Sequence, residues 1–490
     1  MKVLAIDLGT SQIKIMILNS AMEIEYVGSC RYTTISEKRG YLEQDPQEWR
    51  KALRHTLENL KKEIPLEKIG AISFSGHMSG LVAVGQNGEI LRPCILLADS
   101  RSQEECQNLE TRTGKQIREM TGNEVINAFL LPKLLWFKKH ENDLYQKTWR
   151  FILPKDYLRG TLTGRYETEY TDAYNALCLD PISCQWNDNI IEGSGLDREK
   201  FPPVFKPWDF AGNVTDKAEA EYGLLSGTPV FFGGADMACQ ALGNHLFFDG
   251  DSTLTIGTSA TFLVQTSEAD CNYTGKITYH KHILPEKLYA LGSHFNGGLA
   301  VNWFASAHGE TGETDYRFVQ KLAEEALAVP AGSNGVRTIP FLAGSGSPYF
   351  KAADCQTVTG ISTATTRADL FKSELEGITY NLKETLECFQ KLSKNRISEI
   401  LLAGGGCKIT GWPQMTADIL GVPVYLAQNE DASTIGAAII GAYGAGIIKD
   451  MEQAAKQLLQ IKTSIFPDME KTKLYEGYFD EYRELYRKMS

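Results

Sequence analysis

Two Gly-Thr-Ser runs are the residues of this sequence best suited to hold phosphate groups. Gly9-Thr10-Ser11 follows a β-like run at 3–6, and Gly257-Thr258-Ser259 lies between β-like runs at 252–256 and 261–264. A glycine lets the backbone approach a ligand closely, and the neighbouring hydroxyls can bond phosphate oxygens. One such turn in each half of the chain could hold a polyphosphate from two sides.

Two charged residues stand beside the first of these turns. Asp7 ends the first β-like run, where its carboxylate could bind Mg²⁺ directly or through water. Taken alone, the residue better suits a turn aspartate that bonds its own backbone. Lys14 could neutralise phosphate charge or could simply be solvated on a strand face. The phosphate and metal interpretation therefore depends on the combination.

Asp236 is the best candidate for a general base. It follows the run 231–234 and precedes a predicted helix, so it could be a helix N-cap that accepts a backbone N–H. It could also be a base at the mouth of a cleft, preorganised by the same helix N-terminus. The spacing leaves both interpretations open.

A glycine triplet offers a possible surface for a nucleotide base. Gly404-Gly405-Gly406 could let an adenine lie flat against the backbone, or could only turn the chain tightly between strand and helix. The sequence has no G-x-x-x-x-G-K-[ST] motif and no G-x-G-x-x-G after the first strand, which disfavours P-loop and Rossmann folds.

The elements that carry these residues follow a repeated plan. A β-meander is predicted over 3–32, and strand, glycine turn and helix follow one another at 229–237 and again at 400–420. The two Gly-Thr-Ser tips lie 248 residues apart, about half the chain. Two similar α/β domains are the natural interpretation, and a single doubly wound sheet is the alternative.

Local signals place two helices and one boundary. An N-cap acid and a proline at the first helical position predict a helix after Asp45, with an apolar face that ends near Leu60. An apolar stripe predicts a second helix over 367–389. Turn residues at 245–251 place the division between domains 1–248 and 249–490.

Composition limits the classes of protein that remain. The 490 residues are 43% apolar and 23% charged, which predicts a folded chain of two large or three small domains with a ligand cleft between domains. A net charge of −11 without a basic run makes nucleic acid an unexpected partner. The early apolar run contains Asp7, and the apolar stretch 434–448 is too short for a bilayer, so no signal peptide and no membrane partner are expected. Ten cysteines without a C-x-x-C pair fit reduced thiols in the cytoplasm.

Many ordered stretches of this sequence resemble the FGGY carbohydrate kinases, within them the xylulokinase-like branch, from about residue 1 to residue 445. The matching stretches are 6–11 with Lys14, 43–46 with Trp49, 91–93, 99–101, 132–136, 153–159, 162–164, 234–236, 366–370 and 376–377. The resemblance implies an α/β fold of two actin-like (ribonuclease H-like, ASKHA) domains with an interdomain cleft that closes on ATP and a sugar.

The resemblance also implies roles for individual residues. Asp236 matches the catalytic base, and Asp7 matches the Mg²⁺ site. The residues implied to bind ATP are Thr10, Ser11, Lys14, Gly257, Thr258, Gly405, Gly406 and Gln414, and those implied to bind the sugar are His77, Met78, Asp99 and Asp236. The implied partners are ATP, Mg²⁺ and a small sugar or polyol, and a homodimer is the family's frequent arrangement.

The sugar pocket departs from the xylulokinase pattern. His77-Met78-Ser79-Gly80 stands where Gln-Met-His-Gly is usual, Leu97-Ala98-Asp99 where Trp-Asn-Asp is usual, Met237 where Asn is common, and 344–348 lacks the usual two charges. A missing hydrogen-bond partner in a buried site costs about 1–3 kcal/mol, so such changes can switch the substrate. We expect phosphorylation of D-xylulose or a related pentulose, with L-xylulose, ribulose, glycerol, erythritol and gluconate open. Other classes left open are an actin-like ATPase acting on a protein partner and an inactive sugar sensor.

Overall fold

The computed structural model describes residues 1–309, 316–392, 394 and 396–489. These form two compact units. The first comprises Met1–His245, Tyr279–Tyr289 and Asp431–Leu459, and the second comprises Leu246–Thr278, Ala290–Glu430 and Gln460–Ser490.

The first unit is built on a mixed seven-stranded sheet in the order β13-β14-β5-β1-β2-β3, with β15 paired to β5. The strands are β1 (Lys2–Leu8), β2 (Gln12–Asn19), β3 (Ile24–Arg31), β5 (Ile69–Gly76), β13 (Phe210–Asn213), β14 (Pro229–Phe231) and β15 (Gly234–Ala235). β1, β2 and β3 pair antiparallel, which confirms the predicted meander, and β5 runs parallel to β1. The carboxyl ends of β1, β5 and β15 therefore meet at one edge of this sheet.

Helices and short hairpins complete the first unit. Its helices are α1 (Pro46–Leu60), α2 (Gln103–Arg112), α3 (Gly114–Thr121), α4 (Leu130–His140), α5 (Asn142–Lys147), α6 (Pro154–Thr163), α7 (Tyr170–Ala173), α8 (Asp188–Gly193), α9 (Asp216–Tyr222), α10 (Asp236–Gly243), α15 (Ala432–Gly444) and α16 (Met451–Leu458). Its short strands pair as β4 (Glu43–Gln44) with β7 (Cys94–Ile95), β6 (Val82–Val84) with β8 (Arg150–Ile152), β9 (Thr168–Glu169) with β12 (Val204–Phe205), and β10 (Leu179–Asp180) with β11 (Gln185–Trp186).

The helix predicted after Asp45 is confirmed as α1. The Asp45 carboxylate accepts the N–H of Gln47 at 2.9 Å, and Pro46 occupies the first helical position. Trp49 and Leu53 are completely buried in the core of the first unit. Local capping chemistry and an apolar stripe were enough to place this helix.

The second unit is built on the strand order β17-β16-β22-β23-β24 of another sheet. These strands are β16 (Ser252–Ile256), β17 (Ala260–Thr266), β22 (Ile400–Ala403), β23 (Val424–Ala427) and β24 (Ile461–Ile465), and β20 (Arg337–Ile339) pairs separately with β21 (Thr357–Thr359). The same sheet also includes β18 (Thr278–Lys281) and β19 (Leu288–His294), which lie where the chain passes through the segment Tyr279–Tyr289. The helices of the second unit are α11 (Gly298–His308), α12 (Tyr316–Leu327), α13 (Arg367–Leu392), α14 (Trp412–Leu420) and α17 (Met469–Met489). α13 contains the predicted helix 367–389 and extends it by three residues.

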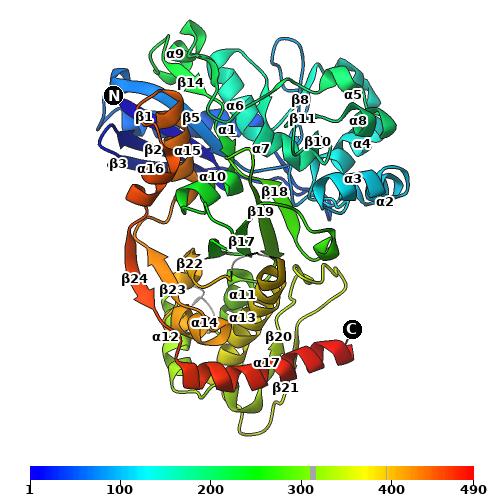
Figure 1. Ribbon diagram of the computed structural model, residues 1–490, viewed down its shortest axis with the longest axis vertical. Helices are drawn as coiled ribbons and strands as arrows, with labels where there is room; N and C mark the ends of the chain where they lie inside the picture. The colour runs from blue at the N-terminus through cyan, green and yellow to red at the C-terminus, as the bar shows by residue number, and fades with distance from the viewer. Residues whose placement is uncertain (310–315, 393, 395, 490) are drawn as a thin grey trace. The chain divides into compact units, whose positions relative to one another are not determined.

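The chain returns to the first unit late in the sequence, so the compact units differ from a single division at 248/249. α15 packs against α10, β1 and β5, and Figure 1 shows α15 and α16, in orange, beside the blue strands β1 to β3. α15 consists largely of buried small and apolar residues, which these elements help to cover. The functional meaning of domains 1–248 and 249–490 stays a prediction.

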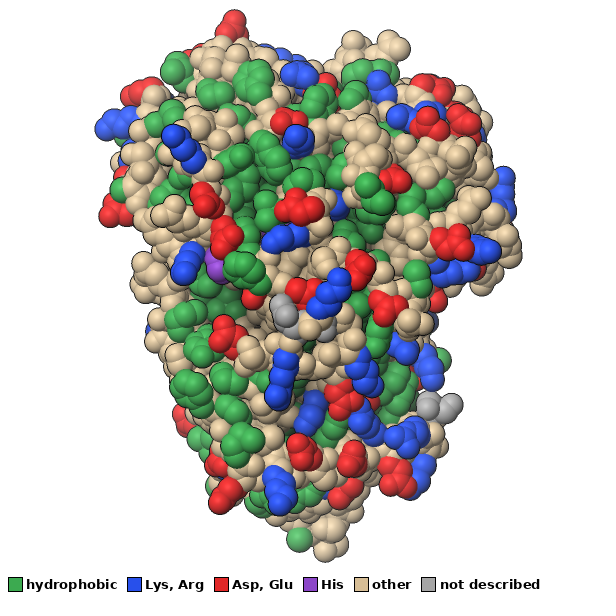
Figure 2. Space-filling view, in the orientation of Figure 1, with side chains coloured by type: hydrophobic (Ala, Val, Ile, Leu, Met, Phe, Trp, Pro, Cys, Tyr) green, Lys and Arg blue, Asp and Glu red, His purple; other side chains and the backbone are tan. Residues whose placement is uncertain are grey.

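The surface carries charges of both signs. Figure 2 shows acidic and basic side chains interspersed on the face drawn there, among apolar and uncharged polar ones. Among the described helices, none has both the length and the apolar character needed to cross a membrane.

Candidate active site

Asp7 lies near the carboxyl end of β1, and its side chain is 5% exposed. Ser433, from α15, donates a hydrogen bond to Asp7 Oδ2 at 2.8 Å. Asp7 Oδ1 is buried and accepts no hydrogen bond from the residues that the structure describes. Burial raises the pKa of Asp7 above its ordinary value, although the hydroxyls of Ser433 and Ser75 and the charge of Lys14 act in the opposite direction. A buried carboxylate oxygen without a donor is a group that a cation would satisfy.

The Gly-Thr-Ser tip after β1 keeps its hydroxyls in solvent. Thr10 and Ser11 are exposed, whereas their backbone is fixed by Gln44, whose Nε2 donates to Thr10 O at 2.6 Å. Lys14, on β2, forms an ion pair with Asp431, a residue that sequence reasoning missed. The tip therefore presents free hydroxyl groups, and Lys14 is partly neutralised.

Asp236 is the first residue of α10, immediately after β15. Its Oδ1 accepts the N–H of Met237 at 2.8 Å, so the carboxylate does bond a backbone amide at the helix start. The residue as a whole retains some solvent exposure, although its carboxylate is surrounded by protein atoms. Burial of the carboxylate raises the pKa of Asp236 to about 8, and the charge of Asp7 adds to this shift. Ala235 is the N-cap of α10, so the interpretation of Asp236 as the N-cap is wrong, and the contact with Met237 uses Oδ1 from the first helical position. The raised pKa gives the ionised carboxylate a higher proton affinity, and it also means that most of the group is protonated at pH 7.

His77 and Met78 directly follow β5, at the same sheet edge as Asp7 and Asp236. His77 is buried, and its Nε2 has no hydrogen-bond partner in the described part of the chain. Burial lowers the pKa of His77 to about 4, so the ring is neutral near pH 7. Met78 is also buried, and its sulfur accepts the Tyr289 hydroxyl at 3.8 Å.

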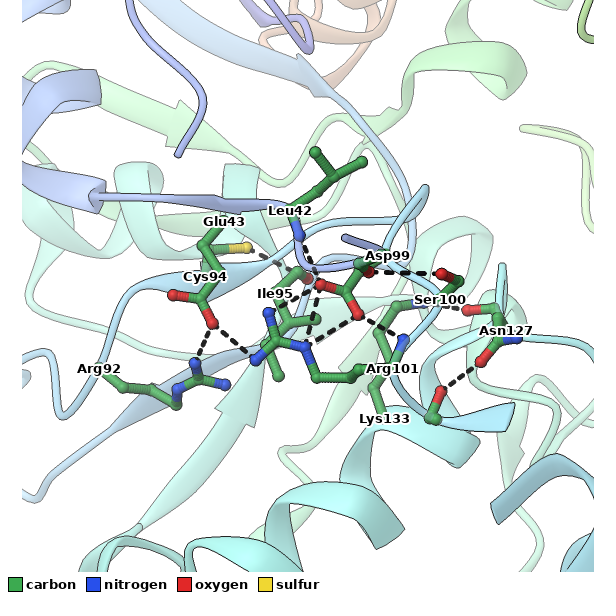
Figure 3. A network of polar contacts seen from close by, with 12 residues as sticks. Leu42, Glu43, Arg92, Cys94, Ile95, Asp99, Ser100, Arg101, Asn127 and Lys133 are labelled. Carbon is green, nitrogen blue, oxygen red and sulfur yellow. Dashed lines mark hydrogen bonds and ion pairs between the residues drawn. The ribbon is translucent and has the colours of Figure 1, made fainter. Parts of the chain in front are cut away.

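Asp99 belongs to a buried network of charged residues, which Figure 3 shows from close by. Its Oδ2 accepts the Leu42 N–H at 2.6 Å and a guanidinium N–H of Arg101 at 2.7 Å, and its Oδ1 accepts the Arg101 backbone N–H at 2.9 Å. Arg101 also pairs with Glu43 at 2.7 Å, and Glu43 pairs with Arg92. Both oxygens of Asp99 are thus bonded to the chain itself, and its contact with a sugar stays a prediction.

In the second unit, the tip after β16 lies against the start of α11. The amide of Gly298 donates to Gly257 O at 2.7 Å, and the amide of Leu299 donates to Thr258 O at 2.8 Å. Thr258 itself is exposed. The sequence analysis missed α11, although the pair Gly297-Gly298 before an apolar run is a signal for a turn that enters a helix.

The glycine triplet follows β22, which runs parallel to β16. Gly404 has a φ of +88°, and a Cβ at Gly406 would lie 2.7 Å from the Cβ of Ile256. Gly405, between them, faces open space. The predicted second phosphate turn and the predicted adenosine surface therefore lie side by side, since Ile256 directly precedes Gly257.

Gln414 lies elsewhere on the second unit. Its Nε2 donates to Asp418 Oδ1 at 2.8 Å and to Phe466 O at 2.9 Å. It lines a hollow of about 380 Å³ whose described lining includes neither Gly405 nor Gly406. A contact of Gln414 with the nucleotide stays a prediction.

Comparison with known proteins defines the class to which this fold and these residues belong. Residues 2–243 match the N-terminal domain of the FGGY family of carbohydrate kinases, and residues 253–445 match its C-terminal domain. The chain belongs to this family. It is a phosphotransferase that acts on an alcohol group of a small sugar, and the family implies ATP as the donor.

Individual relatives match over nearly their whole length. The chain is 32% identical over 489 residues to a xylulose kinase of Bacillus subtilis, covering 99% of this chain and 96% of the relative. It is 30% identical over 491 residues to a xylulose kinase of Lactococcus lactis, covering 100% of this chain and 97% of the relative. The solved structure of xylulose kinase from Rhodospirillum rubrum is 25% identical, with a TM-score of 0.90 and coverage of 100% of this chain and 99% of that one.

Proposed function

We propose that this protein transfers the γ-phosphoryl group of MgATP to a hydroxyl of a small ketose, with D-xylulose or a related pentulose favoured, and that Asp236 is the general base. The observation that carries the proposal is the position of Asp236, which directly follows β15, at the same edge of one sheet as Asp7 on β1, with β5 paired to both strands. The names of the relatives support a pentulose as substrate.

Asp236 would take the proton of the attacking hydroxyl. General-base catalysis requires the carboxylate within hydrogen-bond reach of that hydroxyl, and a raised pKa increases its proton affinity. His77 is neutral and buried, so its Nε2 can exchange a hydrogen bond with a second sugar hydroxyl. Ser79, where a histidine is usual in xylulokinases, leaves L-xylulose, ribulose, glycerol, erythritol and gluconate as alternative substrates.

The carboxylate of Asp7 and its surroundings fit a magnesium ion. The unbonded Oδ1 offers one ligand, and the described residues contain no group of three or more His, Cys, Asp or Glu that could hold a metal by themselves. Mg²⁺ in kinases is usually held by one or two carboxylates together with substrate phosphates and water. When bound, the ion neutralises charge that develops on the phosphates.

Thr10, Ser11, Gly257 and Thr258 would bond the phosphates through exposed hydroxyls and backbone amides, and Gly405 would contact the adenosine. Lys14 would add positive charge, moderated by Asp431. We also propose that the protein is cytoplasmic and forms a homodimer.

The test is ADP release with MgATP against a panel of ketopentoses, ketohexoses, polyols and aldonates. One sugar should stimulate release strongly, and Asp236→Asn should lower kcat by about 100-fold or more with little change in ATP affinity. Asp45→Asn is a matched control, because Asp45 also accepts a backbone N–H at a helix start and is partly exposed. Retention of more than about a tenth of kcat in Asp236→Asn would remove it from the base role. Without stimulation by any sugar, an ATPase or a sugar sensor would become the better proposal.

A further inference from the structure

A buried cluster of charged side chains lies in the first unit, close to the segment that carries Asp236. Lys155, on α6, places its Nζ 2.9 Å from Asp156, 3.1 Å from Glu169 and 3.0 Å from Asp172. Arg159 contacts the same oxygen of Asp156, Oδ1, at 2.5 Å. All five residues have no exposed surface. Charged side chains remain buried only where oppositely charged partners lie close by. We therefore expect these five side chains to keep fixed positions in the folded protein.

Glu169 links the cluster to Thr171. Its Oε1 accepts the Thr171 hydroxyl at 2.8 Å, and its Oε2 accepts the Thr171 N–H at 2.7 Å. The Thr171 hydroxyl in turn accepts the backbone N–H of Ala235 at 2.9 Å. Because an amide can only donate and an ionised carboxylate can only accept, the hydroxyl proton must point at Glu169.

Ala235 is the residue immediately before Asp236, so the hydroxyl of Thr171 fixes the backbone from which the base projects. On its other side, β15 pairs with the last residues of β5. Gly233 holds the chain tightly there, since a Cβ at this position would lie 1.9 Å from Phe74 O. The two-residue strand β15 is thus fixed by β5 along one edge and by Thr171 along the other.

We propose that Thr171 is a positioning residue for the catalytic base, and that Glu169 and Lys155 hold its hydroxyl in place; this inference rests on the proposed role of Asp236. Thr171→Val keeps the shape of the side chain and removes both hydrogen bonds. Without them, the Ala235 N–H is left buried and unpaired, and the segment before Asp236 must shift to find another acceptor. A displacement of about 1 Å at a reacting group can cost about 100-fold in rate.

The experiment compares Thr171→Val with Thr171→Ser, which restores the hydroxyl. Thr56→Val is the matched control, because Thr56 is equally buried and its hydroxyl donates only to a carbonyl of its own helix, Ala52 O at 2.6 Å. For each variant, kcat and the KM values for ATP and sugar are measured, with melting temperature as the check on folding. The same substitutions are then made in the Asp236→Asn background.

We expect Thr171→Val to lower kcat by about 10- to 100-fold with KM for ATP within about twofold, and Thr171→Ser and Thr56→Val to remain near the unmodified protein. In the Asp236→Asn background, Thr171→Val should cause no further loss, because the base that it positions is already absent. An equal loss in both backgrounds, or a kcat of Thr171→Val within about twofold of the unmodified protein, would overturn the proposal.

The two proposals fail differently. An active Asp236→Asn protein contradicts the proposed function, whatever Thr171→Val does. An inactive Asp236→Asn protein with a fully active Thr171→Val protein contradicts only the positioning role. If Thr171→Val does not fold, Thr171→Ala removes the same hydroxyl without adding an atom, and its comparison with Thr171→Ser is judged by the same criteria.

Discussion

Lys155→Met should destabilise the first unit strongly, because it removes the central cation of a buried cluster. The lysine lies 2.9 to 3.1 Å from three carboxylates and has no exposed surface. Methionine has a similar length but no charge. Removing one partner from a buried ionic group leaves uncompensated charge and typically costs about 3–5 kcal/mol.

The loss of Lys155 would affect the three carboxylates to different degrees. Asp156 keeps Arg159, and Glu169 keeps the N–H groups of Thr171 and Asp172. Asp172 loses Lys155, and since burial already raises the pKa of Asp172 well above its usual value, this residue would take up a proton. We therefore expect a loss near the lower end of that range, about 3 kcal/mol, and recovery of about 1 kcal/mol or more when Asp172→Asn is added.

Urea unfolding followed by tryptophan fluorescence measures this loss. The signal reports mainly on the first unit, which holds Trp49, Trp136 and Trp186 among others. The control is Lys51→Met, because Lys51 is 67% exposed and pairs only with Glu48 at the surface; it should change stability by less than about 0.5 kcal/mol. A cost below about 1 kcal/mol for Lys155→Met would refute the reasoning, since a buried cation with three partners cannot be removed so cheaply.

Three further predictions concern the glycine triplet, a buried acid and the proposed metal ligand Asp7. Gly406→Ala should lower stability by about 1–3 kcal/mol, because its Cβ would lie 2.7 Å from that of Ile256. Gly405→Ala should raise the KM for ATP without changing the melting temperature, because Gly405 faces open space. Equal melting temperatures for the two variants would contradict this prediction. Burial raises the pKa of Glu374 from 4.5 to about 8, so the folded chain retains a proton that the unfolded chain releases, and stability should fall as pH rises across that interval. Glu374→Gln should flatten the fall between pH 5 and pH 8 in urea titrations, and an unchanged slope would refute the assignment. Asp7→Asn should raise the Mg²⁺ concentration needed for half-maximal ADP release severalfold, and an unchanged requirement would exclude Asp7 as a ligand.

Local patterns were sufficient to predict several elements, whereas the choice between two similar domains and a single doubly wound sheet depended on the family resemblance. Asp45 and Pro46 located the start of α1, because capping chemistry is written in consecutive residues. The Gly-Thr-Ser tips were placed correctly between strands for the same reason, since turns depend on the residues that form them. The side-by-side position of Gly257 and the glycine triplet followed once β16 and β22 were seen to pair in parallel.

Contacts between distant segments could not be predicted in this way. Lys14 was interpreted as a phosphate ligand or a solvated residue, but it pairs with Asp431, 417 residues away. Ser433, which donates to Asp7, lies 426 residues from it. No periodicity or turn signal encodes such a pairing, because it depends on how the chain returns to the first sheet.

The return of the chain to the first sheet, through α15, also determines how well α10 holds the candidate base Asp236 in place. α10 has only eight residues, too few to hold a fixed direction without packing. A Cβ at Gly243 would lie 2.1 Å from the backbone of α15, and one at Gly436 would lie 2.0 Å from the backbone of α10, so the two helices are in backbone contact. The helix that begins with Asp236 is therefore fixed to the helix that brings Ser433 to Asp7. Since interiors are close-packed and transmit displacement, the geometry between the proposed base and the proposed metal ligand depends on these two glycines, although neither carries a functional group.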